Sequence, residues 1–124
     1  MFDILVEQEI SAGHQLRGYR GKCENCHGHN WKIRLEVTAA DVDELGLGID
    51  FTILKKLLGE LLEPYDHAML NELPEFSKDN PTSENLARVL YRQARQRLPA
   101  ISTRVSLKAV WVWESPRAFV RYYE

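Results

Sequence analysis

Apolar and polar residues alternate in two segments of the N-terminal part of the chain. Ile4, Val6 and Ile10 share one parity with Ala12 and His14. This period of two predicts a strand. From residue 31 to 37 the alternation is regular, because Trp, Ile, Leu and Val interleave with Lys, Arg and Glu. That pattern is typical of a half-buried strand in an antiparallel sheet, so this part of the chain predicts two strands.

A helical period replaces the alternation in the middle of the chain. Between Asp50 and Tyr65 the apolar positions are Phe51, Leu54, Leu57, Leu58, Leu61 and Leu62, with Asp50 suited to an N-cap and Pro64 near the end. A second helix is predicted after Pro81, where Thr82 or Ser83 can cap it and where the apolar stripe is Leu86, Val89, Leu90 and Leu98.

The C-terminal segment returns to a period of two. One phase contains Val105, Leu107, Ala109, Trp111 and Trp113, and a Ser-Pro-Arg turn leads into a last strand within residues 118–123. The other phase, with Val110, Val112 and Glu114, is also largely apolar. We therefore expect the last strands to be covered on both faces, the second cover coming from another subunit.

The element order ββααββ predicts an α+β fold, with an antiparallel four-stranded sheet and two helices packed on one face. The length of 124 residues corresponds to one domain, residues 1–124. A net charge of −2 and the lack of a long apolar run favour neither nucleic acid nor a membrane as partner, and leave a small molecule or a protein. The N-terminus has no signal-peptide pattern, so we expect a cytoplasmic protein.

The segment CENCHGHNW, from Cys23 to Trp31, carries the most chemistry. His27 and His29 are in phase with the apolar face of the second strand, and His14 is in phase with that of the first. If the two strands pair, three imidazoles lie side by side. Three histidines leave one tetrahedral position open, which is typical of a catalytic zinc site.

Two other interpretations of this segment remain. Cys23 and Cys26 have the spacing of a zinc clip and could complete a closed structural site with His27 or His29. That arrangement leaves His14 unexplained, and a domain with this much apolar periodicity has little need of a metal staple. The histidines could also belong to a solvated turn with no metal.

Six segments occur in the order SAGHQL, CENCHGHNW, GIDF, YDHAML, PTSEN and WES. Together they resemble the 6-pyruvoyl-tetrahydropterin synthase and 6-carboxy-tetrahydropterin synthase family over nearly the whole chain. The resemblance implies that His14, His27 and His29 hold a zinc ion. It also implies the tunnelling fold, in which the sheets of several subunits form a barrel. The chain would then be a homo-oligomer, a trimer or hexamer, with sites at subunit interfaces.

The resemblance also implies the catalytic residues. Cys23, four residues before His27, corresponds to the cysteine that acts as general base. Asp66 and His67 correspond to a pair that assists proton transfer from a neighbouring subunit. Without the resemblance, that pair would be ordinary surface residues after a helix.

The same resemblance implies how the substrate is held. Glu114 corresponds to the glutamate that accepts hydrogen bonds from the 2-amino and N3 edge of a pterin, a geometry that suits a carboxylate. Thr82, Ser83 and Glu84 correspond to a segment that lines the pterin pocket. Thr82 and Ser83 are equally well explained as helix-capping residues.

The short offset from Cys23 to His27 and the chain length resemble the bacterial carboxy synthases of queuosine and deazapurine biosynthesis. We therefore expect a zinc-dependent lyase that converts 7,8-dihydroneopterin triphosphate to 6-carboxy-5,6,7,8-tetrahydropterin, with loss of triphosphate and acetaldehyde. The alternatives are a 6-pyruvoyl-tetrahydropterin synthase and a non-catalytic module that binds zinc or pterin. Glu24 adds a third product, because some members of the family use a glutamate near this point to form a hydroxymethyl pterin.

Overall fold

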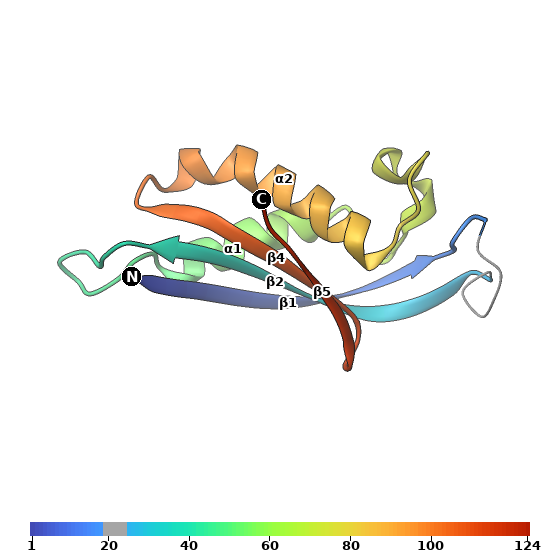
Figure 1. The fold of residues 1–124 in the computed structure, drawn as a ribbon, viewed down its shortest axis with the longest axis horizontal. Helices are drawn as coiled ribbons and strands as arrows, with labels where there is room; N and C mark the ends of the chain where they lie inside the picture. The colour runs from blue at the N-terminus through green and yellow to red at the C-terminus, as the bar shows by residue number, and fades with distance from the viewer. Residues whose placement is uncertain (19–24) are drawn as a thin grey trace.

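The structure is a computed structural model that describes residues 1–18 and 25–124. Its strands are β1 (Phe2–His14), β2 (His27–Ala39), β3 (Ala68–Met69), β4 (Val105–Ser115) and β5 (Ala118–Tyr122). The α-helices are α1 (Phe51–Leu62) and α2 (Ser83–Ile101), and two short 3₁₀ helices, Leu70–Glu72 and Pro74–Phe76, follow β3. Both α-helices lie on the same face of the sheet, above it in Figure 1. The prediction of an α+β fold is therefore confirmed.

The prediction of four antiparallel strands is wrong in one respect. Within the described residues the sheet has five strands in the order β3-β1-β2-β4-β5, and β3 pairs with β1 in parallel. The sheet is therefore mixed. A strand of only two residues, Ala68 and Met69, has too few side chains to show a period, so the sequence pattern carried no signal for it.

The antiparallel ladder of β1 and β2 brings the predicted histidines together. It runs without interruption from Phe2 opposite Ala39 to His14 opposite His27. Directly opposed residues of an antiparallel pair point to the same face. The ladder thus places His14 beside His27, and places His29, which is opposite Ala12, on that face as well.

The two helices cover this face and form the core with it. Asp50 caps α1 by accepting a hydrogen bond from the Thr52 N–H at 2.8 Å, and Thr82 caps α2 by accepting one from Asn85 at 3.1 Å. The largest fully buried side chains include Trp31, Ile33 and Leu35 of β2, Leu54, Leu57 and Leu62 of α1, and Leu86 and Leu90 of α2. Across residues 1–18 and 25–124, no helix has the length and apolar character needed to cross a membrane.

A β-bulge in β4 divides the C-terminal pattern into two phases. Leu107 is opposite Val37, but the next residue of β2, Glu36, is opposite Ala109, so Lys108 is the extra residue. Such an insertion reverses the facing of all later side chains. The expectation of one phase from Val105 to Trp113 is therefore wrong beyond the bulge. Val110 and Val112 join the core beneath the helices instead.

The opposite face of β4 and β5 carries stacked aromatic rings. Trp113 packs against Trp111 and Phe119, with ring centroids 5.8 Å and 4.9 Å away. Glu36 is 6% exposed on this face and accepts a hydrogen bond from the Trp111 indole at 2.7 Å. Phe119 remains 51% exposed. Coverage of this face by another subunit stays a prediction.

Alanine substitutions at two glycines test how tightly the chain packs on the helix-covered face of the sheet. A Cβ added to Gly48 would lie 2.6 Å from Ile4 Cδ1 and 2.8 Å from the Ala39 Cβ, whereas one added to Gly59 within α1 would only touch Gln8 at 3.5 Å. Gly48→Ala should lower the free energy of unfolding by about 1–3 kcal/mol through overpacking. Gly59→Ala should raise it by about 0.5–1 kcal/mol, because glycine is a poor helix former. Urea unfolding of both variants would show this difference, and equal effects would contradict the packing.

Candidate metal centre

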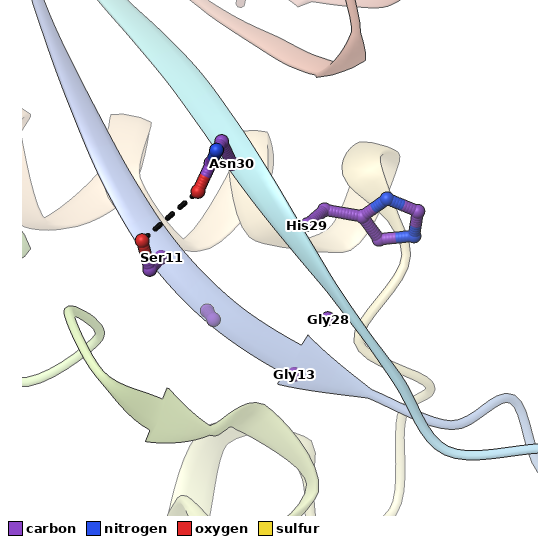
Figure 2. Close-up of a pocket in the computed structure, with 6 residues that line it drawn as sticks. Ser11, Gly13, Gly28, His29 and Asn30 are labelled. Carbon is purple, nitrogen blue, oxygen red and sulfur yellow. Dashed lines mark hydrogen bonds between the residues drawn. The ribbon is translucent and has the colours of Figure 1, made fainter.

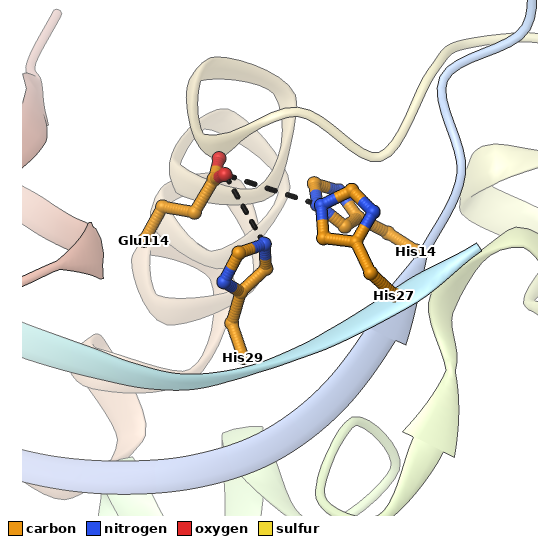
Figure 3. A group of neighbouring side chains, drawn as sticks. All are labelled: His14, His27, His29 and Glu114. Carbon is orange, nitrogen blue, oxygen red and sulfur yellow. Dashed lines mark ion pairs between the residues drawn. The ribbon is translucent and has the colours of Figure 1, made fainter. Parts of the chain in front are cut away.

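Four side chains that offer metal-ligand atoms converge between the sheet and the start of α2. His14 ends β1, His27 and His29 begin β2, and Glu114 lies near the end of β4. Their ligand atoms all lie within 4.8 Å of one another. Figure 3 shows the three imidazoles and the carboxylate directed towards one another. Three distant segments of the chain therefore contribute to one cluster.

Backbone carbonyls determine which nitrogen two of the histidines present. His14 Nδ1 lies 2.8 Å from the Pro81 carbonyl oxygen, and His27 Nδ1 lies 2.7 Å from that of Asn25. A carbonyl only accepts, so each Nδ1 carries the proton and donates it. In a neutral ring the unprotonated nitrogen is then Nε2, which is the arrangement usual for histidines that bind a metal.

Two of the ring nitrogens are buried without a partner. Among side-chain nitrogen and oxygen atoms of the described residues, only Nε2 of His14 and Nε2 of His29 are buried and lack a hydrogen bond. His14 is 1% exposed. An unsatisfied buried polar group costs about 1–3 kcal/mol, so two neighbouring ones need an explanation. A cation between them would receive both lone pairs, and the cluster therefore fits a metal ion.

The electrostatics of His29 favour the neutral ring that a metal requires. Burial lowers the pKa of His29 below its usual value, and the neighbouring His14 and His27 lower it further. The Glu114 carboxylate acts in the opposite direction, but burial is the largest cause. A lowered pKa means that the unprotonated ring is the main form at neutral pH.

Trp31 packs against the imidazoles of His14 and His29. Its ring lies edge-on to His14 and His29, with centroids 4.9 Å and 5.5 Å away. The indole is fully buried and donates a hydrogen bond to the Ala12 carbonyl at 3.1 Å. A large side chain locked in this way restricts the rotation of the rings that pack on it.

The structure places Glu114 closer to the histidines than the sequence led us to expect. Its Oε1 lies 3.2 Å from His29 Nε2 and 4.0 Å from His14 Nε2. Its Oε2 lies 3.5 Å from the hydroxyl of Ser83, which is 7% exposed. Of the other predicted pocket residues, Thr82 caps α2 and Glu84 is exposed in the first turn.

The Asp66–His67 pair lies at the edge of β1. Asp66 Oδ1 accepts from the Ser11 N–H at 3.0 Å and lies 3.0 Å from His67 Nδ1, while the His67 N–H donates to the Ser11 carbonyl at 2.6 Å. These contacts lower the pKa of Asp66, the Ser11 hydrogen bond being the largest cause. The His67 side chain is 81% exposed. Neither residue belongs to the metal-ligand cluster.

A hollow of about 380 Å³ lies over the same end of the β1–β2 ladder. It is lined by Ser11, Ala12, Gly13, Gly28, His29 and Asn30. Gly13 and Gly28 are paired, so no side chain fills this part of the sheet, and Figure 2 shows the Ser11 hydroxyl bonded to Asn30 at its rim. Because Ser11 also anchors Asp66, the hollow adjoins the Asp66–His67 pair.

The predicted cysteines take different places. Cys23, like Glu24, lies outside the described residues. Cys26 is exposed, and its thiol lies 3.5 Å from the Met69 sulfur of β3 rather than with the histidines. Over residues 1–18 and 25–124, the group of potential metal ligands contains no cysteine.

Two contributors to the cluster were missed by sequence reasoning. The carbonyls of Pro81 and Asn25 orient His14 and His27. Both act through the backbone, which every residue possesses, so residue type gives no signal for them. Asn80–Pro81 indicated only the approach to a helix.

Comparison with known proteins agrees with this geometry. The family described as 6-pyruvoyl tetrahydropterin synthase matches residues 3–124. A 6-carboxy-5,6,7,8-tetrahydropterin synthase of Bacillus subtilis is 30% identical, over 98% of this chain and 84% of that protein, and one of Haemophilus influenzae is 29% identical over the whole of both. The solved structure of Caenorhabditis elegans 6-pyruvoyl tetrahydropterin synthase superposes with a TM-score of 0.84 at 25% identity, covering 99% of this chain and 95% of that one.

The fold and the cluster define an α+β protein with a half-enclosed group of three histidines and a glutamate that fits a metal ion. Together with the match over residues 3–124, they show that the chain belongs to the 6-pyruvoyl tetrahydropterin synthase family of enzymes. The resemblance recognised from the sequence is thereby confirmed. The likeness to the Caenorhabditis elegans structure also confirms the fold of the single chain.

The cluster predicts which substitutions remove the metal. His14→Ala and His27→Ala should each abolish retention of about one zinc per chain, because each removes an Nε2 donor. His67→Ala is the matched control, since it changes the fourth histidine, and Cys26→Ala tests the closed structural site. Both should retain zinc in elemental analysis of the purified proteins. Loss of zinc in Cys26→Ala with normal content in His14→Ala would support the closed site instead.

Proposed function

We propose that the chain converts 7,8-dihydroneopterin triphosphate to 6-carboxy-5,6,7,8-tetrahydropterin in a zinc-dependent lyase reaction, with release of triphosphate and acetaldehyde, as a step of queuosine biosynthesis. The observation that carries this proposal is the convergence of His14, His27, His29 and Glu114 within 4.8 Å on the fold of this family. The names of the Bacillus subtilis and Haemophilus influenzae relatives favour the carboxy product.

His14, His27 and His29 are the proposed zinc ligands. Zinc held there supplies Lewis acidity, which makes the protons beside the hydroxyls of the substrate side chain easier to remove. His14 is buried and packs against Trp31, as does the partly exposed His29, so water is excluded from this side of the site and a charge there acts in a medium of lower dielectric constant. The ligands also define where the substrate side chain must lie.

Glu114 is the proposed anchor of the pterin ring. A carboxylate accepts two parallel hydrogen bonds from the 2-amino group and N3 of the ring. Ser83 reaches the same carboxylate and, with Thr82 and Glu84 at the start of α2, borders the ring site. The ring and its side chain would thus bind between β4 and the end of the β1–β2 ladder.

Cys23 is the proposed general base. It lies four residues before His27 in the sequence, so the chain between them is short enough to bring the thiol near the histidines. As a thiolate it would take a proton from the substrate side chain. Triphosphate then leaves by elimination. Addition of one water molecule to the remaining three-carbon dicarbonyl side chain, with cleavage of the bond between its first and second carbons, gives the carboxylate and releases acetaldehyde.

The Asp66–His67 pair is proposed to exchange protons in the site of a neighbouring subunit. Asp66 bonds the Nδ1 side of the His67 ring, which leaves the exposed Nε2 side as the reactive one. The His67 backbone has a φ of 58°, which costs a non-glycine residue about 1–3 kcal/mol. Strain of this kind concentrates at functional sites, and among the described residues the pair is not part of the metal-ligand cluster of its own chain.

The reaction itself provides the main test. Incubation with 7,8-dihydroneopterin triphosphate should yield triphosphate, acetaldehyde and the carboxy pterin, identified by mass spectrometry. Cys23→Ala should lower the rate by roughly 10²–10⁴, the usual contribution of a general base, and should retain its zinc. Cys26→Ala is the matched control, because it removes the other thiol, and should keep the rate.

Other products would each favour a different function. A pyruvoyl pterin would indicate elimination without cleavage, and a hydroxymethyl pterin would indicate aldol cleavage. No turnover in a zinc-loaded protein would favour a binding module. An inactive Cys26→Ala with intact zinc would move the base to Cys26.

Sites shared between subunits predict complementation. Cys23→Ala and His67→Ala should each be inactive alone, but mixed oligomers formed from both should regain activity, because some sites then combine an intact Cys23 with an intact His67 from the neighbour. The control is a mixture of His67→Ala with Asp66→Ala, whose lesions lie in the same pair and should not complement. Sedimentation should show a trimer or hexamer at micromolar concentration. A fully active monomer would contradict the shared site.

A further inference from the structure

The position of Glu114 carries an inference that rests on the proposed function and extends it. We propose that Glu114 is the fourth ligand of the metal while no substrate is bound. When the pterin ring binds, its N–H groups donate hydrogen bonds to the Glu114 carboxylate, which then leaves the metal. Glu114 would thus close the centre in the resting protein and open it when the correct ring arrives.

The contact between Glu114 and His29 has the geometry of two ligands of one ion. Oε1 lies 3.2 Å from His29 Nε2, yet this nitrogen has no hydrogen-bond partner. The contact therefore does not have the geometry of a hydrogen bond. Metal–ligand distances of about 2.0–2.1 Å in a tetrahedral site separate neighbouring ligand atoms by about 3.3 Å. The observed spacing agrees with such an edge.

The remaining distances are compatible with the same ion. Oε1 is 4.0 Å from His14 Nε2, and all four ligand atoms lie within 4.8 Å of one another. The distances above a tetrahedral edge are those that would shorten when an ion draws the four atoms together. Figure 3 shows the Glu114 carboxylate directed towards the histidine rings, so it could occupy the coordination position that three histidine ligands leave open.

Ser83 contacts the second oxygen of the Glu114 carboxylate. Its hydroxyl lies 3.5 Å from Oε2 and is nearly buried at the start of α2. With Oε1 on a bound metal and Oε2 towards Ser83, both oxygens of Glu114 would be engaged. The side chain is nevertheless 31% exposed, so it has room to turn.

The two roles of Glu114 exclude one another. A carboxylate that accepts two parallel hydrogen bonds from a pterin edge needs both oxygens for that purpose. It must therefore leave the metal when the ring binds. The freed position becomes available to the side chain of the same substrate. A sugar phosphate without the paired N–H donors would leave Glu114 in place and the centre closed.

Cobalt(II) provides a readout of this ligand that does not depend on turnover. Its visible d–d absorption reports coordination number and geometry, and competition of the cobalt-loaded protein with a chelator gives the affinity. Glu114→Gln should weaken cobalt binding at least about tenfold, since removing even an outer partner of a metal ligand costs 10- to 100-fold. Glu63→Gln, the same change at an exposed carboxylate at the end of α1, should have no effect.

The exchange is tested with 6-methylpterin, which has the 2-amino and N3 donors but no hydroxyl on its side chain. Its addition should alter the cobalt spectrum of the wild-type protein and leave that of Glu114→Gln unchanged. Wild-type affinity and spectrum in Glu114→Gln would overturn the ligand assignment, whatever product the enzyme makes. A wild-type spectrum insensitive to saturating 6-methylpterin would overturn the exchange. Weakened cobalt binding in Glu114→Gln without any pterin turnover in the wild type would support the ligand and overturn the proposed function.

Discussion

The uninterrupted antiparallel pairing of β1 with β2 is the constraint on which the rest of the structure depends. Because strand side chains alternate between faces, a slip of one residue would turn His27 and His29 away from His14. The same slip would expose Trp31 and Ile33, which are fully buried. Burial of each large apolar side chain contributes about 1.5–3 kcal/mol, so the core itself resists the slip. The stability of the fold and the geometry of the metal centre thus rely on one register.

The centre costs the protein part of that stability. His14 and His29 each bury an unpartnered ring nitrogen, where an apolar side chain of similar size would carry no such penalty. The surrounding structure restricts the rings in two ways. The Pro81 carbonyl accepts a hydrogen bond from His14, and Trp31 packs against His14 and His29. A cation that binds the folded chain alone would offset this cost, because its binding free energy adds to that of folding. Metal affinity and folding stability would then be coupled.

The exposed Asp66–His67 pair is held at β1 by backbone hydrogen bonds. Both backbone groups of Ser11 hold the pair, so His67 keeps its left-handed backbone conformation immediately before β3, a strand of only two residues. The short parallel strand β3 thus serves to fasten these side chains to β1 more than to enlarge the sheet. The pair does not belong to the metal-ligand cluster of its own chain.

The sequence by itself determined the α+β class, both helices with their caps, the two N-terminal strands and the phase of each histidine within its strand, because these features depend on periods and caps that are local. The pairing that brings the three histidines together was only a condition there, and the structure supplied it. It did not determine β3, which is too short to show a period, or the carbonyls that orient the rings, which have no residue signature. Tertiary structure also decided the place of Glu114. The bulge at Lys108 reverses the facing of β4, and only pairing with β2 creates that bulge. The carboxylate therefore reaches the histidines through a register between strands that are far apart in the chain, and no local pattern encodes such a register.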